Sequence, residues 1–420
     1  MNDFLNFLQD CPTQYHLSSY LRSKLIESDF CELKENESWN IIPPKGFFFR
    51  DERELVAWND NGHDRAFFAG SHSDFPCLIL KPKFDEVVDG YRRCRCSIYG
   101  RGAWDTWFDR NLRLAGRLLV KCVNEEKIET LLYDSKIGIA SIPSLEPHLD
   151  SSFSMNPNIN LEKNLIPIYS LENSSPPLLD FIADQLNIDV DSIVGQELRF
   201  VDAEPPSYSN DLIHSQRLNG LQSTFAVFSS FLNSSPEKGT LNMITIFDNE
   251  QTGNKTRMSA TSNAINNTLL RIFQNDKEKI RKIKANSFFV SVDSNHAQHP
   301  SYSKESIFRD VRLGNGICIK RTKNYKTACG MKNEFPIRSV VEEIHSKRIQ
   351  IIDSNNYKQK KGSTFGPRVE NKTGITTADI GIPVIGMRSI REHCSYLDIE
   401  EEMKILSELF NNYSKFEYPF

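Results

Sequence analysis

The sequence lacks the features of membrane, secreted and nucleic-acid-binding proteins. No apolar run approaches the roughly 20 residues that span a bilayer, and the first residues carry no basic segment followed by a hydrophobic core. The net charge of −4 gives no attraction to nucleic acid or to an anionic membrane surface. We therefore expect a cytoplasmic protein with no nucleic-acid partner and no membrane association.

The cysteines also form no recognisable framework. There are nine of them, which is an odd number, and the pair in Cys94-Arg95-Cys96 does not have zinc-finger spacing. Reduced thiols in a cytosolic compartment are the expectation.

Apolar and charged residues are present in the proportions of a globular protein, 39% and 25% of 420 residues. A chain of this length can bury a large core and is expected to form two domains. We predict a main domain of residues 1–83 and 211–420, interrupted by a smaller β-rich domain of residues 84–210. The inserted stretch differs in composition and pattern, with proline-rich turns and a helical pattern over residues 178–186.

Short apolar runs rich in valine, isoleucine and phenylalanine predict strands that are buried on both faces of a sheet. They occupy residues 66–69, 241–247, 287–292 and 382–387. Such runs favour a parallel sheet, so we predict an α/β fold in which a mostly parallel central sheet forms the middle of three layers.

Each of these runs stops at a polar cluster. The clusters are residues 72–74, residues 248–251, Asp293 and residues 387–389. In open α/β sheets ligands bind beyond the carboxyl ends of the strands, so one site is expected to gather all four clusters.

Two histidines near Asp293 allow two interpretations. Asp293, His296 and His299 are spaced by three residues, which on a helix would place them on one face as a metal site. They also follow a predicted strand and precede Pro300, which favours a loop with ordinary hydrogen bonds, and we prefer the loop.

Motifs along nearly the whole chain resemble those of the aspartyl aminopeptidase family of zinc exopeptidases. Residues 69–77 (AGSHSDFPC) are similar to the family's Gly-x-His-Thr-Asp-Ser-Pro segment, and residues 99–110 are similar to its block rich in glycine and tryptophan. The other matching segments, in order, are residues 142–150, 217–220, 247–251, 293–300, 362–367 and 387–392. The resemblance implies that the main domain is the peptidase-like catalytic domain.

The family site holds two zinc ions bridged by a carboxylate, with a water that attacks the peptide bond. By resemblance, His72 and Asp293 match ligands of one metal, and Asp74 matches the carboxylate that orients the histidine. Glu250 matches the general base. These four residues are of the family type.

Three other ligand positions have changed. The bridging aspartate corresponds to Asn219, a glutamate ligand to Gln251 and a histidine ligand to Arg388. An amide oxygen binds zinc poorly, and a guanidinium has no lone pair to donate. Arg388 would instead place a positive charge where a dication lies in the family, and could pair with Glu250 or Asp293.

The resemblance therefore implies an aminopeptidase-like protein that binds peptide and holds one zinc ion or none. Removal of amino-terminal acidic residues is the family activity, and here we expect it to be impaired or lost, which leaves enzymatic activity an open question. The alternative is an active peptidase with a single zinc held by His72, Asp293 and a recruited group such as Asn219 or His296. A third hypothesis is a scaffold that assembles with an active relative.

Four further expectations concern substrate binding and assembly. His148 matches a family histidine that reaches the site of a neighbouring subunit, and an exposed loop histidine is an equal alternative. Lys320 resembles a family lysine near the site that helps hold acidic side chains. The alternative, which we slightly prefer, is that Lys320 is an exposed lysine at the end of a strand. Arg388 is the third candidate for substrate binding. The inserted domain is expected to mediate a homo-oligomer.

Overall fold

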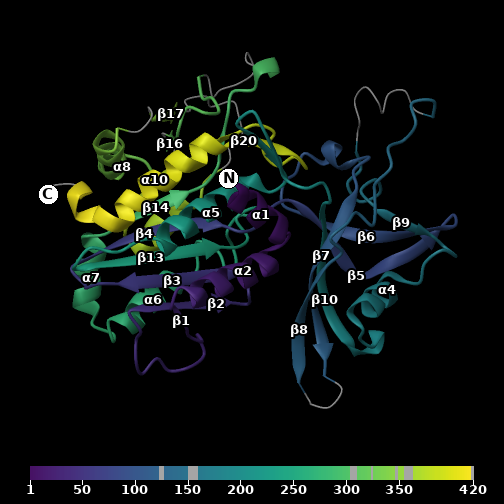
Figure 1. Cartoon of the computed structure of the whole chain (residues 1–420), viewed down its shortest axis with the longest axis horizontal. Coiled ribbons are helices and arrows are strands. Elements are labelled where there is room, and N and C mark those ends of the chain that lie inside the picture. Colours follow the sequence, from purple (N-terminus) through teal and green to yellow (C-terminus); the bar gives the residue numbers. More distant parts are fainter. Residues whose placement is uncertain are drawn as a thin grey trace.

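A computed structural model shows a large sheet flanked by helices beside a smaller β-rich unit (Figure 1). The structure describes residues 1–122, 127–149, 159–302, 310–322, 325–345, 349–353 and 363–417. No helix within these ranges is long and apolar enough to cross a membrane.

The large sheet has nine strands in the order β1-β2-β3-β13-β4-β14-β18-β16-β17. The strands are β1 (Cys31–Glu32), β2 (Lys45–Arg50), β3 (Glu54–Asp60), β4 (Arg65–His72), β13 (Thr240–Phe247), β14 (Phe288–Val292), β16 (Cys318–Arg321), β17 (Gln350–Asp353) and β18 (Thr376–Gly381). The four central strands, β13, β4, β14 and β18, run parallel to their neighbours in this group. Every residue of β13 and β14 is buried, as expected for strands covered on both faces.

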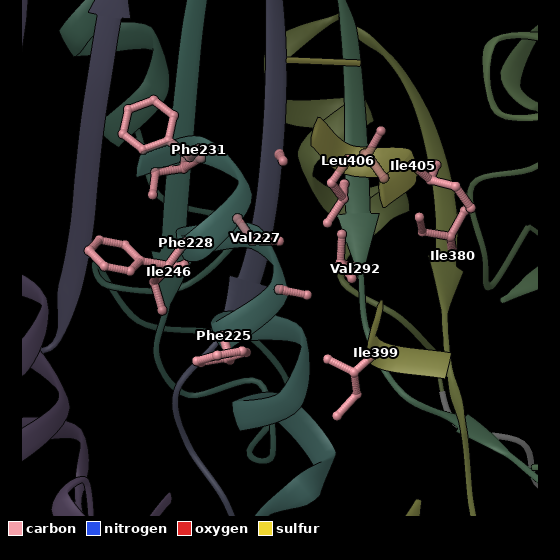
Figure 2. Packing of buried hydrophobic residues seen from close by; sticks show 14 of the residues in the cluster. Phe225, Val227, Phe228, Phe231, Ile246, Val292, Ile380, Ile399, Ile405 and Leu406 are labelled. Carbon is pink, nitrogen blue, oxygen red and sulfur yellow. The ribbon is translucent and has the colours of Figure 1, made fainter. Parts of the chain in front are cut away.

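Helices cover both faces of this sheet, which confirms the predicted three-layer α/β architecture. One face packs against α1 (Asn2–Asp10), α2 (Gln14–Glu27), α5 (Leu218–Leu232), α8 (Met331–Glu343) and α10 (Tyr396–Asn412). The other packs against α6 (Ala264–Ile272), α7 (Lys277–Ala285) and α9 (Gly366–Thr373). Figure 2 shows Phe228 and Phe231 of α5 beside Ile246 of β13, in the core that holds α5 on the sheet. Burial of each such side chain contributes about 1.5–3 kcal/mol.

The second unit is built on a six-stranded sheet with the order β8-β7-β10-β5-β6-β9, in which every pairing is antiparallel. Its elements are β5 (Cys77–Val88), β6 (Tyr91–Tyr99), β7 (Leu112–Lys121), β8 (Ile128–Asp134), β9 (Ile168–Leu171), α4 (Leu178–Leu186) and β10 (Ile193–Asp202). The helix predicted over residues 178–186 is confirmed, and Trp104 and Trp107 lie in the core of this unit. The sheet itself runs from Cys77 to Asp202, and the domain boundaries at 83/84 and 210/211 stay a prediction.

Short elements complete the described chain. Three strands, β11 (Ser207–Ser209), β12 (Leu212–Ser215) and β20 (Glu392–Ser395), form a small antiparallel sheet, and β15 (Asn295–His296) pairs with β19 (Pro383–Val384). The 3₁₀ helices are η1 (Trp104–Trp107), η2 (Val190–Ser192), η3 (Pro300–Tyr302) and η4 (Tyr413–Phe416).

The prediction of a strand of the large sheet over residues 382–387 is wrong in its position. The strand of the large sheet is β18, which ends at Gly381, and only Pro383–Val384 of the predicted run is in a strand, the short β19. The sequence of β18, TTADIG, did not look like a buried strand because it contains Asp379. That carboxylate is buried but accepts hydrogen bonds from the Thr364 hydroxyl (2.7 Å) and the Ala328 N–H. A buried polar residue that is held by hydrogen bonds of this kind hides a strand from an apolar pattern.

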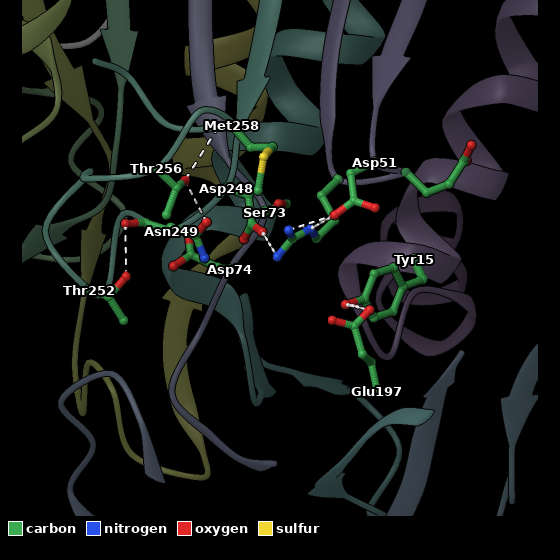
Figure 3. A network of polar contacts seen from close by, with 12 residues as sticks. Tyr15, Asp51, Ser73, Asp74, Glu197, Asp248, Asn249, Thr252, Thr256 and Met258 are labelled. Atoms are coloured by element: carbon green, nitrogen blue, oxygen red, sulfur yellow. Dashed lines mark hydrogen bonds and ion pairs between the residues drawn. The ribbon is translucent and has the colours of Figure 1, made fainter. Parts of the chain in front are cut away.

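A chain of charged side chains joins the two units. Arg53 lies 3.3 Å from Asp248, which follows β13, and 2.6 Å from Asp51. Asp51 also pairs with Arg117 of β7 at 3.0 Å, and Arg117 in turn pairs with Glu197 of β10. Figure 3 shows Asp248 and Asp51 on this path, with Tyr15 and Glu197 at its far end. The junction therefore connects the end of a central strand to the second sheet.

Candidate active site

The polar residues predicted from the strand ends lie together. His72 is the last residue of β4 and is the register partner of Phe247, the last residue of β13. The Ser73 N–H donates to the Phe247 carbonyl at 2.8 Å, so the segments that follow the two strands run side by side. Asp293 follows β14, the neighbour of β4 on the other side.

His72 lies between two carboxylates and is fully buried. Its Nε2 is 3.4 Å from Asp293 Oδ1, and its Nδ1 is 3.3 Å from Asp74 Oδ1 and 3.1 Å from the Asp74 carbonyl. Burial alone would lower the pKa of His72, but the carboxylates of Asp293 and Asp74 outweigh it and raise that pKa well above its ordinary value. The two carboxylates thus favour the protonated form of the imidazole.

Asp74 is the most heavily hydrogen-bonded group of the site. Its carboxylate accepts from the N–H groups of Glu250 (3.0 Å) and Gln251 (2.9 Å) and from the Tyr99 hydroxyl (2.8 Å). Burial opposes its ionisation, yet the neighbouring His72 and these donors lower the pKa of Asp74. Asp74 therefore fixes both the histidine and the segment after β13. Sequence reasoning gave Tyr99 no role, although it begins the segment rich in glycine and tryptophan.

Glu250, Gln251 and Arg388 form a second group at the same edge. Gln251 Nε2 donates to Glu250 Oε2 at 3.0 Å, and Arg388 Nη2 lies 3.9 Å from the same oxygen. That separation is too long for a hydrogen bond but allows charge attraction. Burial raises the pKa of Glu250 to about 7, and nearby Asp293 adds to the shift while His72 opposes it.

Asn219 lies at an irregular point near the start of α5. The ψ angle of Asn219 is 108°, whereas a helical residue has a negative ψ. The next residue, Gly220, has a φ of +100°. The Asn219 N–H donates to Glu392 Oε2 at 2.8 Å, while the other oxygen of Glu392 accepts from the Arg388 N–H. Glu392 therefore holds the backbones of both altered positions. It is a further residue to which sequence reasoning gave no role.

Gly220 lets the chain pass against His72. A Cβ added at Gly220 would lie 2.7 Å from His72 Cε1 and 2.8 Å from the His72 carbonyl, in a left-handed backbone conformation. We expect Gly220→Ala to lower the free energy of unfolding by about 2–4 kcal/mol, because it adds a clash to backbone strain. Denaturant unfolding measures this loss.

Gly374→Ala is the matched control for that substitution. Gly374 also has a positive φ, of +73°, but nothing lies within 4 Å of an added Cβ. It should lose only about 1–2 kcal/mol from strain. Equal losses at the two positions would contradict a tight contact between Gly220 and His72.

Lys320 of β16 is buried, and the exposed strand-end lysine that we favoured from the sequence is therefore wrong. Its ammonium group lies 3.4 Å from Asp293 Oδ2 and donates to the Ser294 carbonyl at 3.0 Å. Although burial opposes it, Lys320 together with His72 holds the pKa of Asp293 well below its usual range.

Of the other candidate histidines, His296 lies near the site: burial lowers its pKa to about 4, and Lys320 and Arg388 add to the shift. His148 is exposed on a loop of the second unit, and a role in a neighbouring subunit stays a prediction. Residues 293–299 form no helix: His296 is in β15, and His299 Nδ1 accepts from the Ser301 N–H at 3.2 Å. The preferred loop is thus confirmed, although it includes a short strand pairing.

Comparisons with known proteins agree with this architecture over the whole chain. The family model described as Aminopeptidase I zinc metalloprotease (M18) matches residues 7–410. Aspartyl aminopeptidase 1 of Schizosaccharomyces pombe is 30% identical, covering 99% of this chain and 95% of that protein. The probable M18 family aminopeptidase 2 of Clostridium novyi is 29% identical, covering 98% of each.

A solved structure shows the same fold. The structure described as the Ape4 and Nbr1 complex superposes with a TM-score of 0.93 at 27% identity, covering 100% of this chain and 87% of that one. The resemblance inferred from the motifs is confirmed. The chain belongs to the Aminopeptidase I zinc metalloprotease (M18) family.

Proposed function

We propose that this chain is an aspartyl aminopeptidase-like protein that binds peptide amino termini but hydrolyses them poorly, because its site does not hold a zinc pair. The observation that carries the proposal is the identity of the side chains at one site. Asn219 and Gln251 supply amide oxygens and Arg388 supplies a guanidinium, at the positions where the family resemblance implies a histidine and two carboxylates.

The donor set does not fit two zinc ions. Within the described ranges, no group of three or more His, Cys, Asp or Glu side chains is placed to hold a metal ion. Catalytic zinc usually takes about three protein ligands besides water. Around His72 the strong donors are the two acids, and on the other side Glu250 is joined by an amide and a cation.

Charge supports the same conclusion. A guanidinium group carries a fixed positive charge, and that of Arg388 lies 3.9 Å from Glu250, the carboxylate on the altered side of the site. A dication placed beside it would be repelled by a fixed charge that is only partly exposed to solvent. Arg388 thus supplies part of the positive charge that balances these acids.

A single zinc ion is the second candidate. His72 Nε2 and Asp293 Oδ1 are only 3.4 Å apart, and the buried Asn219 Oδ1 has no hydrogen-bond partner in the described part of the chain. These are the donors that a one-zinc site would use. Lys320 already pairs with Asp293, however, and competes for that carboxylate.

Metal content and turnover separate the two candidates. We expect the purified protein, after dialysis against zinc, to hold fewer than about one zinc ion per chain. It should release aspartate from an Asp-Ala-Ala peptide at least about a hundredfold more slowly than a two-zinc relative, because its water is not activated by metal. One tightly held zinc with measurable turnover favours the second candidate. Two zinc ions per chain would show the proposal to be wrong.

Location and assembly extend the proposal. We infer a cytoplasmic homo-oligomer that assembles through the six-stranded unit, which exposes apolar side chains such as Ile128 and Val194. Sedimentation of the purified protein measures the number of subunits.

A further inference from the structure

A pair of histidines lies on the small three-stranded sheet, outside the candidate active site. His214 of β12 and His393 of β20 are partners across the two antiparallel strands, and their Nδ1 atoms are 2.6 Å apart. The rings are inclined to each other at 76°, and both residues are half-buried. Two imidazole nitrogens therefore converge at a place that is partly open to solvent.

A metal ion could take the place of the proton between these nitrogens. In a pair of neutral imidazoles, one Nδ1 donates its N–H and the other Nδ1 accepts it with a lone pair. If the donor ring shifts its proton to Nε2, both Nδ1 atoms present lone pairs. Zinc–imidazole bonds of 2.0–2.1 Å at a tetrahedral angle place the two nitrogens about 3.3 Å apart. The two rings must therefore separate by about 0.7 Å to admit an ion.

Ser209 of β11 is placed to set the tautomer of His214. Its Oγ lies 3.4 Å from His214 Nε2, so the hydroxyl can accept the Nε2–H and leave the lone pair on Nδ1. Histidines that bind metals usually donate their second ring N–H to an oxygen in this way. The main chain of His393 is held as well, because its N–H and its carbonyl both pair with Ile385 at 2.9 Å.

The surroundings of His393 favour a neutral ring, which is the form that binds metal. Burial, His214 and Arg391 all lower the pKa of His393. Arg391 itself is bound to Asp202 at 2.8 Å and to Glu204 at 2.9 Å. An incoming ion therefore meets a neutral imidazole at His393 and an arginine whose charge is already paired.

We propose that His214 and His393 bind one divalent ion of the late first-row transition metals through their two Nδ1 atoms, with water in the other positions. Imidazole suits nickel, copper and zinc, and affinity for the same donors is highest for copper. In the part of the chain that the structure describes, no group of three His, Cys, Asp or Glu side chains is placed to hold a metal. Binding by two ligands is therefore reversible and weaker than at a four-ligand structural zinc site.

The ion would join two segments that lead to altered positions of the active site. β12 ends shortly before Asn219, and His393 directly follows Glu392 in β20. The Glu392 carboxylate accepts from the N–H groups of Asn219 and Arg388. A bridge from β12 to β20 therefore stabilises the backbone that positions Asn219 and Arg388 without contacting either side chain.

Calorimetric titration of the chelator-treated whole protein with Ni²⁺ near neutral pH tests the site. We expect His214→Gln and His393→Gln each to weaken Ni²⁺ binding by at least about tenfold, because each removes one of two ligands. His63→Gln is the matched control, since His63 is also half-buried but pairs with Asp60 instead of a histidine. The control should bind Ni²⁺ as the native protein does. No binding by the folded native protein, or equal binding by all three variants, overturns the proposal.

Zinc held by this pair is separated from zinc at the altered active site by one comparison. The His214→Gln variant keeps every active-site residue, so its zinc content reports on the active site alone. The test of the proposed function and the test of the histidine pair can therefore fail independently.

Copper gives a readout that needs no variant. The electron paramagnetic resonance spectrum of the native protein with one equivalent of Cu²⁺ should show two coordinated imidazole nitrogens. Hydrogen exchange in residues 212–215 and 392–395 should slow when Ni²⁺ is added to the native protein but not to the two pair variants. A copper spectrum without imidazole nitrogens, or exchange that Ni²⁺ leaves unchanged, would mean that the pair is an ordinary hydrogen bond and would overturn the proposal.

Discussion

The triple substitution Asn219→Asp, Gln251→Glu and Arg388→His is expected to produce a protein that holds about two zinc ions per chain and releases aspartate from Asp-Ala-Ala. The carboxylate at 219 would bridge the metals, and the carboxylate at 251 and the imidazole at 388 would complete the second one. His72, Asp293 and Glu250 are already in place at the same edge of the sheet. Elemental analysis and peptide hydrolysis measure the result.

Single substitutions should not have this effect. Asn219→Asp alone adds a buried acid beside Glu392, while the Arg388 guanidinium remains 3.9 Å from Glu250. Arg388→His alone leaves two amides as ligands, which bind zinc poorly. We therefore expect the gain to be strongly non-additive, as for groups that act as one unit.

A fourth substitution provides the control for turnover. Adding Glu250→Gln to the triple variant should leave zinc bound but remove most of the regained activity, because Glu250 is the general base that the family resemblance implies. Activity without bound zinc would contradict the mechanism. A triple variant that folds but binds no zinc would contradict the assignment of the three ligand positions.

Much of the fold could be predicted because burial on both faces leaves a simple pattern. The runs at residues 66–69 and 241–247 lie in β4 and β13, and the run at 287–292 matches β14 except for its first residue; all or nearly all residues of these strands are buried. The same reasoning failed for β18, whose buried Asp379 accepts hydrogen bonds from residues outside the strand. Those partners are far away in sequence, so no local pattern reveals them.

The sequence predicted the site residues that follow the ends of neighbouring strands. It did not predict the residues from other parts of the chain that hold them by hydrogen bonds. His72 and Asp293 were placed together because parallel neighbouring strands end at one edge. Tyr99 and Glu392, which hold Asp74, Asn219 and Arg388, come from other sheets. The burial of Lys320 also depends on a neighbour, Asp293, that is 27 positions away.

Replacing Glu402 by glutamine is expected to remove a large part of the pH dependence of stability. Glu402 is in α10, is fully buried, and has no hydrogen-bond partner on either carboxyl oxygen in the described part of the chain. Burial raises the pKa of this carboxyl to about 8, with Asp398 and Asp293 adding to the shift and Lys320 opposing it. In the unfolded chain the pKa is about 4.3, so the folded protein binds this proton more tightly.

The sign of the effect follows from that difference. Stability from the bound proton is fully present below the unfolded pKa and is lost as pH rises towards the folded pKa, at up to about 1.4 kcal/mol per pH unit. Between about pH 5 and pH 8 the native protein should therefore lose on the order of 3 kcal/mol that Glu402→Gln does not lose. Urea unfolding at several pH values gives both curves.

Glu400→Gln is the matched control, because Glu400 is exposed on the same helix and its carboxyl faces water. The Glu402→Gln curve should meet the native curve below about pH 4, where Glu402 is protonated in both the folded and the unfolded chain, and lie above it at pH 8. The Glu400→Gln curve should stay parallel to the native one at every pH. Parallel curves for both variants would mean that Glu402 is charged in the folded protein, and that Lys320, which already faces Asp293, also compensates this second carboxylate.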